Sequence, residues 1–316
     1  MPALQISPRG NFGNQILQLL YARAIQSEVP QIELLGQLPA VAAAVREPLI
    51  PRTLLPSIRS HSIPPRKIGN LYLNSGLRAA KFQQVPLDVD NFGFLETARN
   101  LIPRLSSPVE TASKNEILIN VRGAETLAAT HRDYGPVPVS FYELVCDHTG
   151  KDPVFLGQLG NDFYSDLLRQ RFPRARFIPS QGLLEDFEAM RQSTYLVLSL
   201  STFSWLAGWF SDATEIFMPL IGFFNPIQRP DAWLLPRNDG RYRYFQFPLR
   251  EWVASEAQIK ALSHRIDVAE KSFSDLEPIR MIQLSSRVAE HKREIDRLIF
   301  YARVQVALGL YSRYKL

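Results

Sequence analysis

Short apolar segments alternate with amphipathic segments along the chain from Asn115 to about residue 220. Five segments rich in β-branched and aromatic residues have the length of buried strands; they lie at 117–121, 154–156, 175–178, 195–200 and 215–218. Segments with apolar residues at helical spacing lie between or after them, at 141–146, 163–171, 184–191 and 203–211. This alternation of strand and helix predicts a parallel, doubly wound sheet.

The first thirty residues repeat the order of strand, turn and helix. Leu4–Ile6 is a strand candidate, and a turn that contains Gly10 and Gly13 leads into a run with apolar residues at helical spacing. Asn14 and Gln15 place amide donors and acceptors at the start of this helix. The glycine spacing is not that of the dinucleotide-binding fingerprint. The alternative interpretation is a loop followed by a well-capped helix.

Seven prolines between Pro39 and Pro86 break the following stretch into short pieces. We expect helices near 38–46 and 91–101 and loops elsewhere in this stretch. Further along, helical composition returns over 256–271 and from Glu277 onward. With 316 residues, the chain has the length of two average domains.

Two of the turns that follow predicted strands carry residues suited to phosphate. Ser201, Thr202 and Ser204 lie between the strand at 195–200 and an apolar helix, where backbone N–H groups and the helix dipole favour anions. The simpler interpretation is that Ser201 and Ser204 only cap this helix. Arg122 follows the strand at 117–121, and its permanently charged guanidinium can stabilise a departing diphosphate. The alternative is a surface ion pair between Arg122 and Glu125.

Composition and charge describe a soluble globular protein. Hydrophobic residues make up 46% and charged residues 21% of the chain. The single cysteine, Cys146, excludes a disulfide framework and indicates a reducing compartment. The first ten residues lack the apolar core of a signal peptide, and no apolar run is long enough to span a bilayer. We therefore expect a cytoplasmic location.

The segment Arg280–Leu316 contains eight basic and three acidic residues, an excess that equals the net charge of +5 of the whole chain. Its apolar residues fall on one helical face. Three interpretations compete, namely a helix packed on the protein body, a basic helix on an anionic membrane surface, and a nucleic-acid patch. We favour packing for the first half and contact with the inner membrane surface for the last two turns. We expect no nucleic-acid partner because no binding motif accompanies the charge.

Three segments together resemble the signature regions of the α-1,2-fucosyltransferases and the related protein O-fucosyltransferases, in the same order. The segments are Gly10-Asn-Phe-Gly-Asn-Gln, Asn120-Val-Arg-Gly-Ala-Glu and Ser201-Thr-Phe-Ser-Trp-Leu-Ala-Gly-Trp. The resemblance implies an α/β protein of the GT-B type with two Rossmann-like domains. It implies an acceptor-side domain over 1–112, a nucleotide-sugar donor domain over 113–250 and a helical C-terminal extension over 251–316.

The resemblance also implies an inverting glycosyltransferase that uses GDP-fucose with neither metal nor cofactor. By this resemblance Arg122 holds the β-phosphate of the donor, and Gly13 and Asn14 approach the diphosphate from the first domain. The match also implies that Ser201, Thr202 and Phe203 lie at the nucleotide and that Asp186 is the acid that reads guanine. Asn120 and Ser204 are further candidate binding residues. An acid at the first turn of a helix is also favoured by the helix dipole alone, which is the simpler interpretation of Asp186.

The middle segment departs from the family pattern. Asn120 replaces a histidine, Gly123 replaces a second arginine, Ala124 replaces a glycine and Glu125 replaces an aspartate. Arg122, which matches the first arginine of the family, is retained.

We therefore hypothesise that the protein transfers fucose from GDP-fucose to a glycan hydroxyl in surface polysaccharide synthesis. Glu125 is the favoured general base, with His131 and Asp133 as further candidates. One alternative is a transferase for another GDP-sugar, with mannose or heptose in place of fucose. A second is a non-catalytic nucleotide-sugar binder that scaffolds a glycan assembly complex.

Overall fold

The computed structural model describes residues 1–38, 43–44, 55–60, 62–93, 98–99 and 101–309. The chain forms two compact units: unit 1 comprises Met1–Ala98 and Met281–Leu316, and unit 2 comprises Arg99–Arg280. Each unit is built around a parallel sheet flanked by helices, and the chain ends with a long helix. The predicted α/β class with a C-terminal helix is confirmed.

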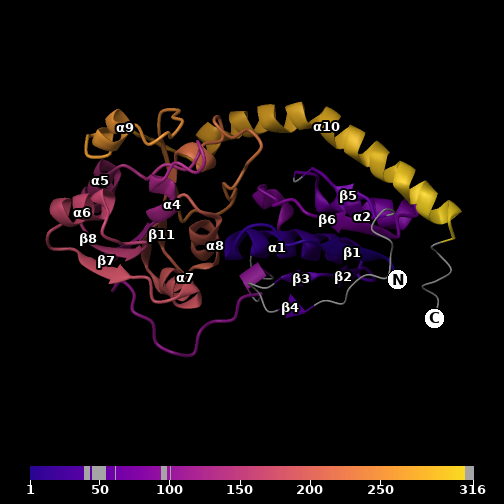
Figure 1. The fold of residues 1–316 in the computed structure, drawn as a ribbon, viewed down its shortest axis with the longest axis horizontal. Helices are drawn as coiled ribbons and strands as arrows, with labels where there is room; N and C mark the ends of the chain where they lie inside the picture. Colours follow the sequence, from indigo (N-terminus) through magenta and orange to yellow (C-terminus); the bar gives the residue numbers. More distant parts are fainter. Residues whose placement is uncertain (39–42, 45–54, 61, 94–97, 100, 310–316) are drawn as a thin grey trace. The chain divides into compact units, whose positions relative to one another are not determined.

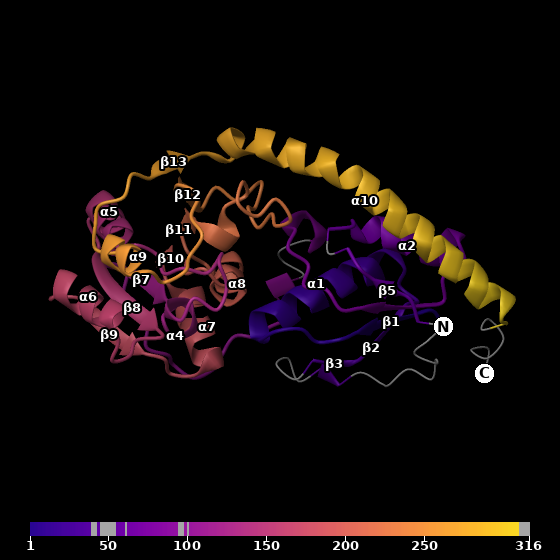
Figure 2. The same cartoon turned by 45° about the horizontal axis from the view of Figure 1, so that its top comes forward.

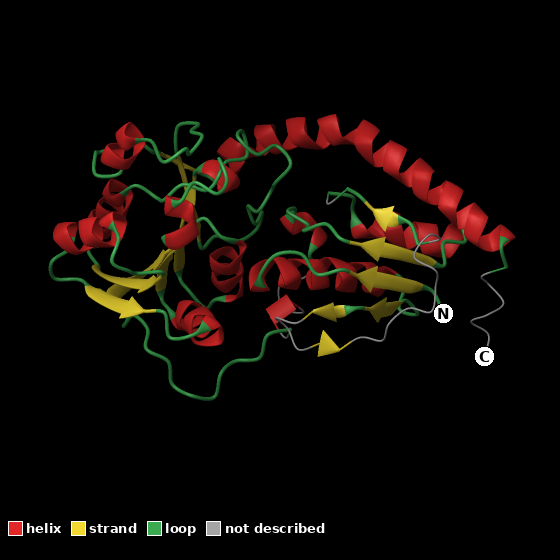
Figure 3. Ribbon diagram, viewed as in Figure 1, coloured by secondary structure: helices red, strands yellow, loops and turns green. Residues whose placement is uncertain are grey.

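Unit 2 contains a seven-stranded sheet with the order β13-β12-β11-β10-β7-β8-β9, drawn as yellow arrows in Figure 3. Among the described strand pairs of this sheet, β12 and β13 pair antiparallel and the others pair parallel. The strands are β7 (Glu116–Val121), β8 (Asp152–Gly157), β9 (Arg176–Pro179), β10 (Tyr195–Val197), β11 (Glu215–Leu220), β12 (Tyr242–Gln246) and β13 (Ala269–Lys271). All five strands predicted from the sequence are present, as β7 to β11. The chain runs outward from β7 to β9, returns to β10 beside β7, and then runs outward the other way, which is the topology of a doubly wound sheet.

Helices cover both faces of this sheet (Figure 1). They are α4 (Ala124–Leu127), α5 (Val139–Thr149), α6 (Phe163–Arg171), α7 (Leu183–Gln192), α8 (Thr202–Phe210) and α9 (Glu256–Ala261), with a 3₁₀ turn η4 (Gly222–Phe224). α5 contacts α6, and α7 contacts α8. Because both faces are covered, three successive β7 residues, Ile117 to Ile119, are fully buried.

One predicted helix of unit 2 is partly wrong. The run 256–271 is helical only over α9, and Ala269–Lys271 forms β13 instead. These three residues pair with β12, whose outer edge would otherwise carry unpaired backbone N–H and C=O groups.

Unit 1 contains a four-stranded parallel sheet with the order β2-β1-β6-β5. Its elements are β1 (Ala3–Ile6), α1 (Phe12–Glu28), β2 (Glu33–Leu35), β3 (Gln37–Leu38), β4 (Ala43–Ala44), β5 (Ser57–Ile58), α2 (Pro65–Asn74), β6 (Ala79–Phe82) and the 3₁₀ turn η3 (Val89–Asn91). The predicted order of strand, turn and helix at the N-terminus is confirmed. The predicted helix near 38–46 is wrong at the described residues, where β3 pairs antiparallel with β4. Leu38 precedes Pro39, a position that disfavours helical backbone angles.

The long helix α10 (Phe273–Ala307) continues from unit 2 into unit 1, where it runs beside α2 (Figures 1 and 2). The helix predicted from Glu277 onward is confirmed, and its packing on the protein body is seen over unit 1. The face that packs is largely polar, with buried Gln283, Arg287, His291, Glu294 and Gln305 beside Leu298 and Ala302. Apolar side chains instead face outward, since Ile282 is 71% and Phe300 63% exposed. The last two turns of the predicted helix lie outside the described residues.

Specific hydrogen bonds and ion pairs hold α10 on unit 1. Arg287 Nη1 lies 3.3 Å from Asp88 Oδ2, and both side chains are buried. Gln305 accepts a hydrogen bond from the backbone N–H of Ala79 at 3.2 Å and donates one to its carbonyl at 2.9 Å, next to β6. Glu294 Oε1 accepts the backbone N–H of Arg59 at 2.6 Å. The helix is therefore positioned by directional contacts rather than by a continuous apolar stripe.

The buried pair of Asp88 and Arg287 gives a stability prediction. Replacing Asp88 with Ala leaves the Arg287 guanidinium buried without its carboxylate, which we expect to lower the free energy of unfolding by about 3 kcal/mol. Urea unfolding followed by circular dichroism measures this loss. The control is Asp296→Ala on the exposed side of α10, which should change stability by less than about 0.5 kcal/mol. Equal effects of the two substitutions would contradict a specific role for the buried pair.

An ion pair at the start of β7 gives a pH prediction. Hydrogen bonds from Arg176 lower the pKa of Glu116 from 4.5 to about 2, and Arg176 Nε lies 2.8 Å from Glu116 Oε1. A lowered pKa stabilises the fold above pH 4.5, and this contribution is lost as the pH falls towards 2. In Arg176→Ala, the pKa of Glu116 should return towards 4.5 in an NMR titration. Arg169→Ala, which removes an exposed pair with Asp166, should leave it unchanged.

Candidate functional site

The candidate site lies at the carboxyl ends of β7 and β10, which are neighbours in the sheet of unit 2. The chain leaves β7 towards one edge of the sheet and leaves β10 towards the other. In doubly wound sheets, the crevice between two such strands is where ligands bind. Here the segments that follow Val121 and Val197 leave the sheet at this switch point, and they contain Arg122 and Ser201.

A chain of buried side chains joins these two segments. Ser199 Oγ donates to Asn120 Oδ1 at 2.6 Å, and Asn120 Nδ2 donates to the Leu156 carbonyl of β8 at 3.2 Å. Ser199 Oγ also lies 3.3 Å from Ser201 Oγ. Asn120 is buried, with 6% of its surface exposed. Through these hydrogen bonds it connects the ends of β7, β8 and β10. Its predicted contact with a ligand stays a prediction.

Two serines fix the amino end of α8. Ser201 Oγ accepts the backbone N–H of Ser204 at 3.0 Å, and Ser204 Oγ accepts the backbone N–H of Ser199 at 3.0 Å. The capping interpretation is confirmed for Ser201, whereas the Ser204 hydroxyl fixes the segment before the cap. Thr202 and Phe203 form the first turn and are half-buried. The capped turn directs the positive end of the α8 dipole towards the crevice.

Arg122 bridges the two strand ends. Its Nη1 donates to the carbonyl of Leu200 at 2.6 Å, and its guanidinium carbon lies 5.0 Å from the ring centroid of Tyr134. The side chain is half-buried. A guanidinium held at this position places a permanent positive charge beside the α8 terminus, which together can balance a diphosphate.

The candidate bases differ in their surroundings. Glu125 lies within α4, and its side chain lies outside the described residues, so its role stays a prediction. Asp133 is 15% exposed at its side chain, and its carboxylate accepts hydrogen bonds from Gln228 at 2.8 Å and Arg229 at 3.1 Å. His131 Nδ1 accepts the backbone N–H of Asp133 at 3.1 Å. A neutral imidazole with Nδ1 as acceptor carries its proton on Nε2, which makes Nε2 a donor in this arrangement.

Asp186 lies in the first turn of α7 and is 6% exposed. Its two carboxylate oxygens accept hydrogen bonds from Ser180 Oγ at 2.6 Å and from the backbone N–H of Gln181 at 2.8 Å. These bonds fix the turn that precedes α7. Its predicted role in reading guanine stays a prediction, and a base that bound here would share an already hydrogen-bonded carboxylate.

Gly13 and Asn14 lie in the first turn of α1, in unit 1. The preceding loop turns at Gly10, whose φ of +64° is in the left-handed region that favours glycine. Gln18, which the sequence analysis did not single out, is fully buried and donates from Nε2 to the carbonyls of Ser7 at 2.9 Å and Gln84 at 3.2 Å. It joins the loops that follow β1 and β6. The sequence feature that could have indicated this role is a polar glutamine among the apolar residues of the predicted helix.

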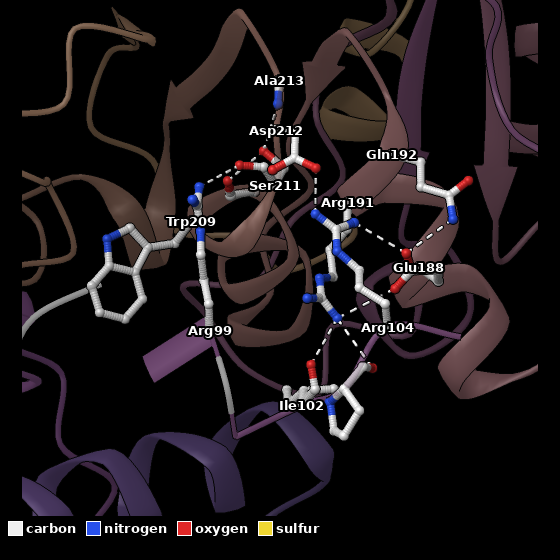
Figure 4. Close-up of polar contacts among 12 residues, drawn as sticks. Arg99, Ile102, Arg104, Glu188, Arg191, Gln192, Trp209, Ser211, Asp212 and Ala213 are labelled. Carbon is white, nitrogen blue, oxygen red and sulfur yellow. Dashed lines mark hydrogen bonds and ion pairs between the residues drawn. The ribbon is translucent and has the colours of Figure 1, made fainter. Parts of the chain in front are cut away.

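A cluster of arginines fixes the far end of α8 and the start of unit 2 (Figure 4). Arg99 donates to the Ser211 carbonyl at 2.7 Å, at the carboxyl end of α8. Arg191 of α7 is buried and donates to the carbonyl of Ile102 at 3.0 Å. Arg104 donates to Glu188 of α7 at 3.0 Å. The segment that begins unit 2 is thereby fastened to the two helices whose amino ends carry Asp186 and Ser201.

Three further features of the described residues concern the cysteine thiol, metal binding and membrane crossing. Burial raises the pKa of the Cys146 thiol to about 12, which keeps it protonated and a poor nucleophile at neutral pH. Within the described ranges, no group of three or more His, Cys, Asp and Glu side chains is placed to hold a metal ion. None of the helices in the described part of the chain combines the length and apolar character that crossing a membrane requires.

Comparisons with known proteins give distant structural likenesses. No protein-family model and no curated protein matches the chain. Similar solved structures include the dodecameric iron-containing heptosyltransferase TibC in complex with ADP-D-β-D-heptose, with a TM-score of 0.38 and 15% identity over 76% of this chain and 63% of TibC. Another is the E. coli heptosyltransferase WaaC with ADP-2-deoxy-2-fluoro heptose, with a TM-score of 0.38 and 12% identity over 83% of this chain and 98% of WaaC. The chain thus spans less than two thirds of the length of TibC.

The cap of α8 gives a prediction for the site. Ser201→Ala removes the side-chain acceptor for the Ser204 N–H, and we expect it to lower the free energy of unfolding by about 1 kcal/mol. Ser201→Asn, which can still cap, should lose much less. Thermal unfolding of both variants measures the difference. A loss that is the same for Ala and Asn would mean that the cap is not what Ser201 contributes.

Proposed function

We propose that the protein is a glycosyltransferase that binds a nucleotide-sugar at the crevice between β7 and β10. The observation that carries this proposal is the position of Arg122 beside the capped amino end of α8. A diphosphate carries negative charge on several oxygens, and a guanidinium and a helix amino end are its usual protein partners. The motif resemblance supports the same assignment of these residues.

In the proposed reaction, a hydroxyl of a glycan acceptor attacks the anomeric carbon of the donor sugar. The new glycosidic bond forms as the bond from that carbon to the diphosphate oxygen breaks, and the nucleoside diphosphate leaves. Arg122 and the α8 terminus stabilise its developing charge without a metal ion. A base, for which Glu125 is our first candidate, takes the hydroxyl proton.

We propose GDP-fucose as the first donor to test, on the basis of the motif resemblance. Both carboxylate oxygens of Asp186 already accept hydrogen bonds, so adenine nucleotides belong in the same test. GDP-mannose and a GDP-heptose are included as the alternative GDP-sugars. We further propose that 113–250 binds the donor and 1–112 the acceptor, and that the last turns of the basic tail contact a membrane surface.

A non-catalytic nucleotide-sugar binder is the second candidate. The surroundings of Asp133 and His131 favour this second candidate. The Asp133 carboxylate already accepts a hydrogen bond from Arg229, and His131 Nδ1 already accepts the backbone N–H of Asp133. Release of GDP that depends on the sugar acceptor separates the enzyme from the binder.

The first test is thermal stabilisation by nucleotides in the presence of EDTA. A ligand at 100 times its dissociation constant stabilises the folded protein by about 2.7 kcal/mol. We expect GDP to raise the melting temperature more than UDP, CDP or ADP. Stabilisation by another diphosphate alone would retain the site and replace the proposed donor, whereas no response to any of the four would overturn the proposal.

Substitution of Arg122 tests the site directly. Arg122→Ala should weaken binding of the nucleoside diphosphate by about 10- to 100-fold, because a charge-assisted contact to phosphate is lost. The matched control is Arg132→Ala, which removes an arginine that is 73% exposed at its side chain and lies in the loop before α5. Titration calorimetry measures both affinities. Equal affinities for Arg122→Ala and the unaltered protein would place the diphosphate elsewhere.

A further inference from the structure

Four side chains form a continuous stack that ends at Arg122. The Arg122 guanidinium carbon lies 5.0 Å from the centroid of the Tyr134 ring. The Tyr134 and Phe223 rings are stacked, with centroids 5.3 Å apart and an angle of 17° between their planes. The guanidinium carbon of Arg229 lies 5.5 Å from the Phe223 centroid. The order is therefore cation, ring, ring and cation.

The four residues come from separate segments of unit 2. Arg122 follows β7, Tyr134 lies in the loop before α5, Phe223 lies in η4 after β11, and Arg229 lies beyond η4. The stack thus joins the loops that follow two parallel strands. Tyr134 and Phe223 contact each other although 88 residues separate them in the chain, so the arrangement depends on the fold of the sheet.

Ion pairs anchor the end of the stack that is remote from Arg122. Arg229 Nη2 and Nε lie 2.6 and 2.8 Å from the two carboxylate oxygens of Asp231, and Arg229 Nη1 lies 3.1 Å from Asp133 Oδ2. A bidentate contact with a carboxylate fixes the plane of a guanidinium. Arg229 therefore presents a fixed cationic face to Phe223.

The backbone holds the two loops against each other at the rings. The N–H of Phe223 donates to the Asp133 carbonyl at 2.9 Å. At the preceding Gly222, φ is +51°, and an added Cβ would lie 2.2 Å from the same carbonyl oxygen. Only glycine permits this close approach. The contact sets the distance between the loop that carries Tyr134 and the turn that carries Phe223.

We propose that the Tyr134–Phe223–Arg229 stack is a positioning device that orients Arg122 for contact with the terminal phosphate of a nucleoside diphosphate. This inference rests on the proposed function. The Tyr134 ring supports the guanidinium face of Arg122, and the Leu200 carbonyl accepts from its edge, so the two contacts together fix its plane. Arg229 contributes through the stack, while its own charge pairs with Asp231 and Asp133.

The experiment compares GDP with GMP, which lacks the terminal phosphate. Dissociation constants are measured by titration calorimetry for the unaltered protein and for Tyr134→Phe, Tyr134→Leu and Arg122→Ala. The double variant Arg122→Ala/Tyr134→Leu is measured in the same way. We expect Tyr134→Leu to reduce the preference for GDP over GMP by about 3- to 10-fold, because the cation–ring contact is lost. Tyr134→Phe retains a ring and should keep the preference. The double variant should lose no more than Arg122→Ala alone, since the stack acts through Arg122.

The outcomes separate the stack from the proposed function. If the unaltered protein binds none of GDP, UDP, CDP and ADP, the proposed function is overturned and the role of the stack with it. If it binds another of these diphosphates instead of GDP, the comparison uses that diphosphate and its monophosphate. If GDP preference depends on Arg122 but not on Tyr134, only the stack is overturned. Equal loss of GDP and GMP affinity in Tyr134→Leu would indicate a general structural role and would also overturn it. Should Tyr134→Leu fail to fold, Arg229→Met removes the end of the stack that is remote from Arg122. It should also reduce the preference for GDP over GMP, and an unchanged preference would overturn the inference.

Discussion

The parallel pairing of β7 with β10 is the interaction on which the candidate site depends. Leu196 and Val197 pair with Leu118 and Ile119, so the two strands end at the same edge of the sheet. That arrangement brings Arg122 to the Leu200 carbonyl and Ser199 to Asn120. Neither loop alone has both features of the candidate site, because the positive charge comes from one strand end and the helix terminus from the other.

Both ends of α8 are held in place, which gives its dipole a fixed direction. The Ser201 side chain caps the amino end, while Arg99 and Arg241 donate to the Ser211 carbonyl at the carboxyl end. A charge that develops on a leaving group is stabilised most effectively by groups that need not reorient. Under the proposed function, the arginine cluster, the cap at Ser201 and the stack that contacts Arg122 form one preorganised environment.

The helix α10 shows a different use of polar residues. Its inward face is held by the ion pair of Arg287 with Asp88 and by the hydrogen bonds of Gln305 to β6, while Ile282 and Phe300 face outward. Buried polar contacts require correct geometry and are costly to break, so they specify one position for the helix on unit 1. A periodic apolar pattern would have tolerated small shifts along the helix axis.

The sequence by itself determined the α/β class, the five central strands of unit 2 and the helices between them, because buried parallel strands and amphipathic helices leave local patterns. It also placed Arg122 and Ser201 in the segments that follow β7 and β10, and their roles in a site stay predictions. It could not predict the largely polar packing face of α10, the strand β13, or the partners of Asp186, Asp133 and His131. The contact of Tyr134 with Phe223 likewise exists only in the folded chain. Tertiary structure decided these features because strand order and loop packing determine which distant side chains meet, and no local pattern records that order.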